Sequence, residues 1–87
     1  MANIASQKKR IARSAREHDE NRRLTSAVKT HFRRLEHVAA SGDADALRSE
    51  HRSLVSRIDK AVQRGALHPG NGARKKARAA KIASREL

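Results

Sequence analysis

Apolar residues recur every three or four positions along the chain and form two stripes of helical periodicity. The first stripe predicts a helix over residues 6–40, and the second predicts a helix over residues 44–64. Between them, Gly42 suits a left-handed helix end and Asp43 suits the N-cap of the next helix. So short a joint predicts an antiparallel helical hairpin. The stripes consist of Leu24, Ala27, Val28, Phe32, Leu35, Val38 and Ala39, and of Leu47, Leu54, Val55, Ile58, Ala61 and Val62.

The remaining Gly and Pro residues fall between Gly65 and Gly72 and mark a loop. Gly65 is expected to end the second helix, and Asn71 to cap a third helix over residues 72–86. The sequence therefore predicts an all-α fold, a three-helix bundle whose first helix is long and extended at its N-terminus. A stripe of small residues on the third helix would let another backbone approach closely, and it consists of Ala73, Ala77, Ala80 and Ser84.

Large apolar residues are concentrated in the middle of the chain. Eleven lie between Leu24 and Leu67, whereas residues 2–23 and 68–87 hold two each. Ordering a residue costs about 1–2 kcal/mol of backbone entropy, so segments with little to bury gain little from folding alone. We predict a single domain over residues 1–87, with a core at about 24–67 and basic arms at 1–23 and 68–87.

Charge is distributed in the opposite way. The chain has 21 Lys and Arg against 9 Asp and Glu, a net charge of +12. Residues 1–16 and 65–87 carry +5 each, and residues 17–64 only +2. The segments with the least core therefore carry the most uncompensated charge, which favours a polyanionic partner, nucleic acid first and an anionic membrane surface second.

The first and third helices also begin with cations, where the helix dipole favours anions. A phosphate bound at either helix N-terminus would offset this unfavourable charge, because it pairs with the side chains and with the free amides. Within these segments Lys9, Arg13 and Arg16 share a face. On the third helix a single basic stripe repeats at helical spacing and consists of Arg74, Arg78, Lys81 and Arg85. We expect phosphate contacts from Lys8, Lys9, Arg10, Arg13, Arg16, Arg22 and Arg23, and from Arg74, Lys75, Lys76, Arg78, Lys81 and Arg85.

Several classes of function are excluded by residue types. The chain has no Cys, and Phe32 is its only aromatic residue, which removes thiolate metal sites and the aromatic stacking platforms of RNA-binding sheets. His31 and His51 lie at core-stripe spacing and are expected at the edge of the bundle rather than in a metal site. A thin bundle offers no pocket for a nucleophile and its base. We therefore expect no enzyme activity, no metal and no cofactor.

Certain motifs resemble the bacterial small-subunit ribosomal protein S20 family over the whole chain. They are the opening Met1–Arg10, Asn21 with Arg22 and Arg23, the pairs Lys29-Thr30 and Gly42-Asp43, the stretch from Asp59 to Gly65, Leu67-His68, and Ala73–Lys76. The resemblance implies a monomer lodged in folded 16S ribosomal RNA, which binds the 5′ domain and contacts the 3′ minor domain during assembly. It implies a place in the bacterial cytoplasm, with only peripheral contacts to other small-subunit proteins. It also adds Asn3, Ser6, Lys29, His68 and Asn71 as candidate RNA contacts.

Two departures from the family pattern affect these expectations. Pro69-Gly70 stands where the family commonly has Lys-Asn after the histidine, which leaves the contact at Asn71 open. His68 has two interpretations, an RNA contact or a local cap. Residues 17–20 are more acidic than usual, so fewer phosphate contacts are expected there.

Other partners remain alternatives. A helical DNA-binding protein would make similar phosphate contacts, although the chain lacks a recognition helix with base-reading side chains. A membrane-surface helix would need a broad apolar face, which neither basic arm has. Residues 1–16 also have the composition of a mitochondrial presequence, which would not explain the equally basic C-terminal segment.

Overall fold

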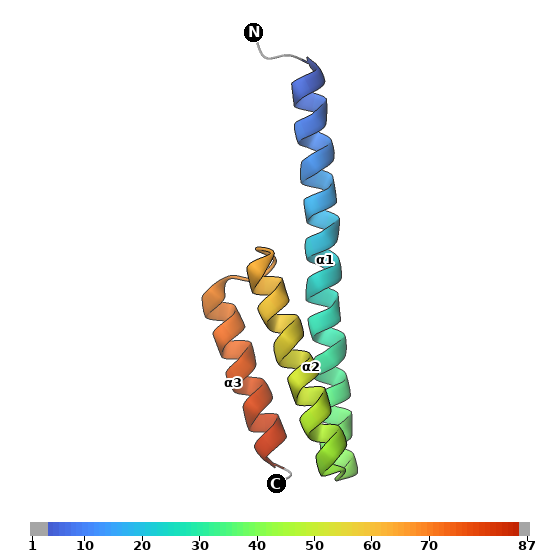
Figure 1. Cartoon of the computed structure of the whole chain (residues 1–87), viewed down its shortest axis with the longest axis vertical. Coiled ribbons are helices and arrows are strands. Elements are labelled where there is room, and N and C mark those ends of the chain that lie inside the picture. The colour runs from blue at the N-terminus through green and yellow to red at the C-terminus, as the bar shows by residue number, and fades with distance from the viewer. Residues whose placement is uncertain (1–3, 86–87) are drawn as a thin grey trace.

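The computed structural model describes residues 4–85, and the side chains of residues 4–84. It contains α1 (Ile4–Ser41), α2 (Ala44–Gln63) and α3 (Pro69–Arg85), with no strand among the described residues. The predicted all-α three-helix fold is confirmed. In Figure 1, α2 and α3 lie beside one half of α1, and the N-terminal half of α1 extends beyond them. The Cα trace measures 63 × 20 × 13 Å, so the molecule is long and thin.

A glycine with positive φ lies in each of the two turns, one between α1 and α2 and one after α2. Gly42 has φ of 78°, and the carboxylate of Asp43 accepts a hydrogen bond from the Ala46 amide at 3.1 Å. Gly65 also has φ of 78° and follows the end of α2. Its amide donates to the Val62 carbonyl at 3.0 Å, and the Ala66 amide donates to the Ala61 carbonyl at 2.8 Å. These paired bonds satisfy the last carbonyls of α2, and both glycine predictions are confirmed.

The start of α3 differs from the prediction. The helix begins at Pro69, and the ring of His68 caps it, because its Nδ1 accepts a hydrogen bond from the Gly70 amide at 3.0 Å. Pro69 suits the first helical position, where no amide hydrogen is needed. Asn71 lies inside the first turn, and its Oδ1 accepts from Arg74 Nη2 at 2.6 Å. The prediction of Asn71 as the cap was therefore wrong.

The core joins all three helices. Both predicted stripes supply it, and α3 adds Ala79 and Ile82, so buried side chains extend past residue 67. The predicted small-residue stripe of α3 faces solvent, and the inward face lies one position earlier, beginning at the buried Gly72. The core residues are Val28, Phe32, Leu35, Ala39, Leu47, Leu54, Ile58, Ala61, Ala79 and Ile82.

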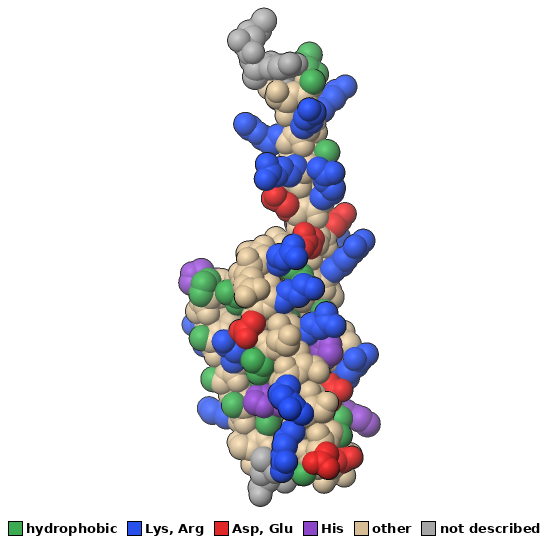
Figure 2. Space-filling model, viewed as in Figure 1, with side chains coloured by type: hydrophobic (Ala, Val, Ile, Leu, Met, Phe, Trp, Pro, Cys, Tyr) green, Lys and Arg blue, Asp and Glu red, His purple; other side chains and the backbone are tan. Residues whose placement is uncertain are grey.

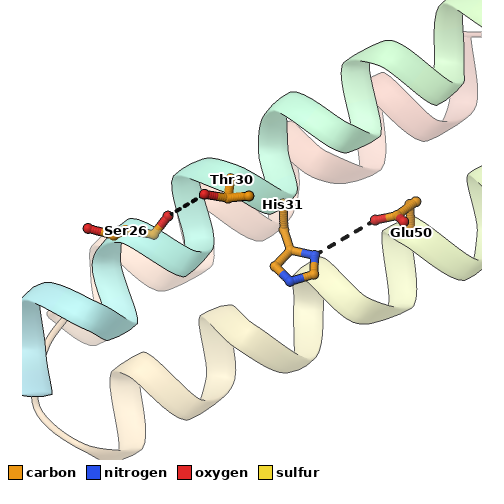
Figure 3. Close-up of polar contacts among 4 residues, drawn as sticks. All are labelled: Ser26, Thr30, His31 and Glu50. Carbon is orange, nitrogen blue, oxygen red and sulfur yellow. Dashed lines mark hydrogen bonds and ion pairs between the residues drawn. The ribbon is translucent and has the colours of Figure 1, made fainter.

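Polar side chains flank this core between α1 and α2. His31 Nδ1 lies 3.7 Å from Glu50 Oε2, with side chains 13% and 28% exposed, and the two face each other across the helix pair in Figure 3. Next to His31 on α1, the Thr30 hydroxyl donates a hydrogen bond at 3.0 Å to the carbonyl of Ser26, one turn earlier. His51 is half-buried as well. The predicted place of both histidines at the edge of the bundle is confirmed.

Candidate nucleic-acid interface

Residues 4–20 of α1, which we call the projecting segment, are exposed along their whole length. They are helical, and at about 1.5 Å per residue they span about 25 Å. Figure 2 shows Lys and Arg side chains standing out on both sides of this segment. The first turn holds no acid, so the predicted mismatch between cations and the helix N-terminus is present. The cations are Lys8, Lys9, Arg10, Arg13 and Arg16.

Acidic residues gather where the projecting segment meets the bundle. Glu17 pairs with Arg13 at 3.4 Å, with both side chains more than 60% exposed. Glu20 Oε1 lies 3.1 Å from Nη1 of Arg64, the residue that ends α2. Exposed pairs of this kind contribute little stability, about 0–1 kcal/mol. Their geometric effect is clear, since Glu20 joins α1 to the end of α2 at the base of the projecting segment.

Arg22, Arg23 and Lys29 follow on α1 and are exposed. Arg22 and Arg23 lie with Asp19 and Ser26 around a shallow hollow on the surface. All three predicted cations therefore remain accessible to a partner. They extend the row of exposed positive charge from the projecting segment onto the bundle.

Three exposed cations of α3 form a second basic surface, the α3 stripe, defined by Arg74, Arg78 and Lys81. The stripe has the predicted spacing, and the side chain of Arg85 lies outside the described part. Lys75 and Lys76 are half-buried and flank the stripe. Lys76 Nζ lies 2.9 Å from Asp59 Oδ1 on α2, so this cation already has an internal partner.

The four remaining predicted contacts differ in their surroundings. The capping role of His68 is the one seen in the structure, and its ring remains exposed. Ser6 is exposed on the projecting segment, whereas Asn3 lies outside the described residues. Asn71 is exposed and holds Arg74, so the two present a joined polar surface at the start of α3.

The sequence analysis missed a group of cations on α2. Four exposed side chains, Arg48, Arg52, Arg57 and Lys60, border shallow hollows on the outward face of this helix. The spacing of Arg48, Arg52 and Lys60 by multiples of four could have indicated one face. The near balance of acids and bases over residues 17–64 concealed it.

Nothing in the described residues points to metal or membrane chemistry. Within residues 4–85, no three His, Asp or Glu side chains are grouped to hold a metal ion. No described helix is long and apolar enough to cross a bilayer.

These features define a class, that of small, basic, helical proteins with an extended charged surface. The comparisons with known proteins identify the family within it. A family model described as ribosomal protein S20 matches residues 2–84. Small ribosomal subunit protein bS20 of Cyanothece sp. is 45% identical, over all of this chain and 95% of that protein.

Similar identities recur in distant bacteria. The bS20 proteins of Koribacter versatilis and Corynebacterium diphtheriae are 41% and 40% identical. These matches cover 90% and 87% of this chain, and 88% and 87% of the relatives. The chain belongs to the ribosomal protein S20 family.

Proposed function

We propose that this protein is a structural constituent of the small ribosomal subunit that binds 16S ribosomal RNA directly and stabilises its folded form during assembly. The observation that carries the proposal is the pair of exposed basic surfaces, the projecting segment and the α3 stripe, on one continuous helical scaffold. Family membership supports the same assignment. The role is structural, without catalysis or a small-molecule substrate.

The mechanism follows from charge and shape. Cations of both surfaces neutralise phosphates where RNA helices crowd together, and the displaced counterions favour binding. The start of α1, whose first turn holds no acid, also favours a phosphate near Ser6 and Lys8 through the helix dipole. Specificity comes from the shape of the folded RNA, because the deep, narrow groove of an A-form helix hides its base edges.

The internal ion pairs divide the proposed contacts into cations with a carboxylate partner and cations without one. Lys8, Lys9, Arg10 and Arg16 have no carboxylate partner among the described residues, and the same holds for Arg74 and Lys81. These cations are fully available to phosphates. Arg13, Lys76 and Arg78 already pair with a carboxylate, so each must release it before it meets a phosphate and contributes less as a phosphate contact.

The proposed setting is a single copy in the bacterial cytoplasm, within the ribosome. The projecting segment and the bundle reach different parts of the RNA, which fits contacts with the 5′ domain and the 3′ minor domain. Contacts with other small-subunit proteins are peripheral. In addition to the cations compared above, the proposed RNA contacts include Asn3, Asn71, His68, Lys29 and Arg85.

Comparative binding tests the proposal. The dissociation constants of the full chain for folded 16S RNA and for a DNA duplex of equal length are measured at one fixed salt concentration. A protein that recognises the shape of folded RNA should bind it much more tightly than the duplex. Both affinities should fall steeply with salt concentration if about 6–10 phosphates are contacted. Equal affinity for the two would replace the ribosomal assignment with a general polyanion binder.

A further inference from the structure

A groove runs between α1 and α3 on the bundle, with a volume of about 520 Å³. This volume is within the range of about 300–1,000 Å³ found for small-molecule sites. Its floor is apolar, formed by Val28 and Phe32 of α1 and by Leu67. We call it the α1–α3 groove.

The walls of the α1–α3 groove are positively charged. Lys29 and Arg33 line it from α1, and Lys75 and Arg78 from α3, against the single carboxylate of Glu36. Neither Lys29, Arg33 nor Lys75 has an ion-pair partner within the described part of the chain. An anionic group entering the groove therefore meets three cations that are not already neutralised.

Arg78 is held across this groove by two contacts with α1. Its guanidinium carbon lies 5.2 Å from the centre of the Phe32 ring, and its Nη2 lies 3.5 Å from Glu36 Oε1. Phe32 and Glu36 are one turn apart, so both contacts come from the same face of α1. The side chain nevertheless stays 67% exposed. The planar guanidinium of Arg78 is therefore held in place beside the apolar floor and is still accessible to solvent.

We propose that the α1–α3 groove receives one unstacked nucleotide of the bound RNA. Its base lies against the Arg78 guanidinium and the apolar floor, and its phosphate lies among Lys29, Arg33 and Lys75. Unstacked bases of RNA commonly stack on aromatic rings or on arginine planes. The proposal rests on the proposed function, since it names the part of the RNA that this groove takes.

The lining distinguishes a nucleotide from a simple anion. A site for phosphate alone would gain nothing from an apolar floor, and Glu36 would weaken it. A carboxylate can instead accept a hydrogen bond from the amino group of a base. With a single aromatic residue the chain cannot form the stacking platform of an RNA-binding sheet. An arginine that lies on that one ring still offers a planar surface to a base, and no second aromatic residue is needed.

Nuclear magnetic resonance of the full chain tests the occupant. Phe32 is the only Phe, Tyr or Trp residue, so its ring signals have to be distinguished only from those of the five histidines. Adenosine 5′-monophosphate, ribose 5-phosphate and a short polyglutamate peptide are titrated separately at equal ionic strength. The nucleotide should shift the Phe32 ring and the methyl groups of Val28 and Leu67, and the base-free phosphate should leave them in place. Equal shifts from both phosphates, or larger shifts from the peptide, would overturn the proposal.

Charge-preserving variants test the groove in RNA binding. Arg78→Lys keeps the charge and removes the plane, and Arg34→Lys makes the same change at an exposed arginine of α1 that lies outside the groove and outside the proposed RNA contacts. Loss of base stacking should weaken binding of folded 16S RNA about tenfold for Arg78→Lys, with little change for Arg34→Lys. Equal affinities for the two variants would overturn the proposal, whereas the wild-type preference for folded RNA over duplex DNA would still support the proposed function.

A filling variant provides an independent measurement. Thr25 lines the α1–α3 groove, and the neighbouring Ser26 lies outside it. Thr25→Trp should block the nucleotide-dependent methyl shifts without altering charge, and Ser26→Trp should leave them unchanged. Circular dichroism establishes that both variants remain helical. Unchanged shifts in a folded Thr25→Trp protein would contradict the proposed occupant.

Discussion

Gly72 of α3 packs closely against α2, and the contact leaves no room for a side chain. A Cβ atom at this position would lie 2.5 Å from Val62 Cγ2 and 3.7 Å from Ile58 Cγ2. Its importance is therefore steric, because its backbone has an ordinary helical conformation. Single residues of this kind decide how closely α3, which has few large apolar side chains, packs against the rest of the bundle.

Replacing Gly72 with Ala sets two effects against each other. Helix propensity favours Ala by about 1 kcal/mol, whereas overpacking costs about 1–3 kcal/mol. We expect a net loss of about 1 kcal/mol in the free energy of unfolding, measured by chemical denaturation. In a Val62→Ala background the obstacle is gone, so Gly72→Ala should then stabilise the protein. A stabilising effect in the wild-type background would show that α2 and α3 are not in close contact here.

His68 gives a second prediction at this scale, since its ring caps α3. Removing an N-cap costs about 0.5–2 kcal/mol. His68→Ala should lower the unfolding free energy by about 1 kcal/mol, and His68→Asn should retain most of it, because an asparagine oxygen can accept the same hydrogen bond. His37→Ala, at an exposed histidine of α1, is the matched control and should have little effect. Equal losses for His68→Ala and His37→Ala would exclude the cap.

At the scale of the elements, the helices divide into core-forming faces and charged faces that contribute little to stability. Leu35 and Ile58 are fully buried on α1 and α2, whereas Lys9 is exposed. Leu35→Ala or Ile58→Ala should cost about 2–5 kcal/mol of unfolding free energy. Lys9→Ala should change it by less than about 0.5 kcal/mol. Similar denaturation midpoints for the core and surface variants would contradict this division.

The first two helices could be predicted from the sequence because their apolar stripes are long and their ends carry glycine and aspartate signals. The third was misplaced at its start, since Asn71 is the more usual cap and Pro69-Gly70 has the composition of a turn. Its inward face was also misassigned, because Gly72 and Ala79 give almost no periodic signal. The exposed cations of the projecting segment and of α3 could be found from the charge distribution and their spacing, whereas those of α2 were missed. The α1–α3 groove could not be found in this way, since it depends on how α3 lies against α1.

For the whole molecule, order in the free protein should fall with distance from the core. The projecting segment is exposed along all of residues 4–20, and Ile4 and Ile11 are each 69% exposed. Its amides should exchange with solvent quickly in the free protein and slowly when bound to 16S RNA. Amides of α3, which buries Ala79 and Ile82, should exchange more slowly than those of the projecting segment. Strong protection of residues 4–20 without RNA would contradict this expectation.

The continuity of α1 links the rotation of the projecting segment to the bundle. Because one helix forms both, each residue inserted between them would turn every projecting side chain by about 100° around the axis while moving it only about 1.5 Å along it. An insertion of seven residues would restore the original direction to within about 20°. The number of residues between the cations of the projecting segment and the bundle therefore fixes the direction in which those cations point. A change of length in α1 would alter the direction of its charges far more than their reach.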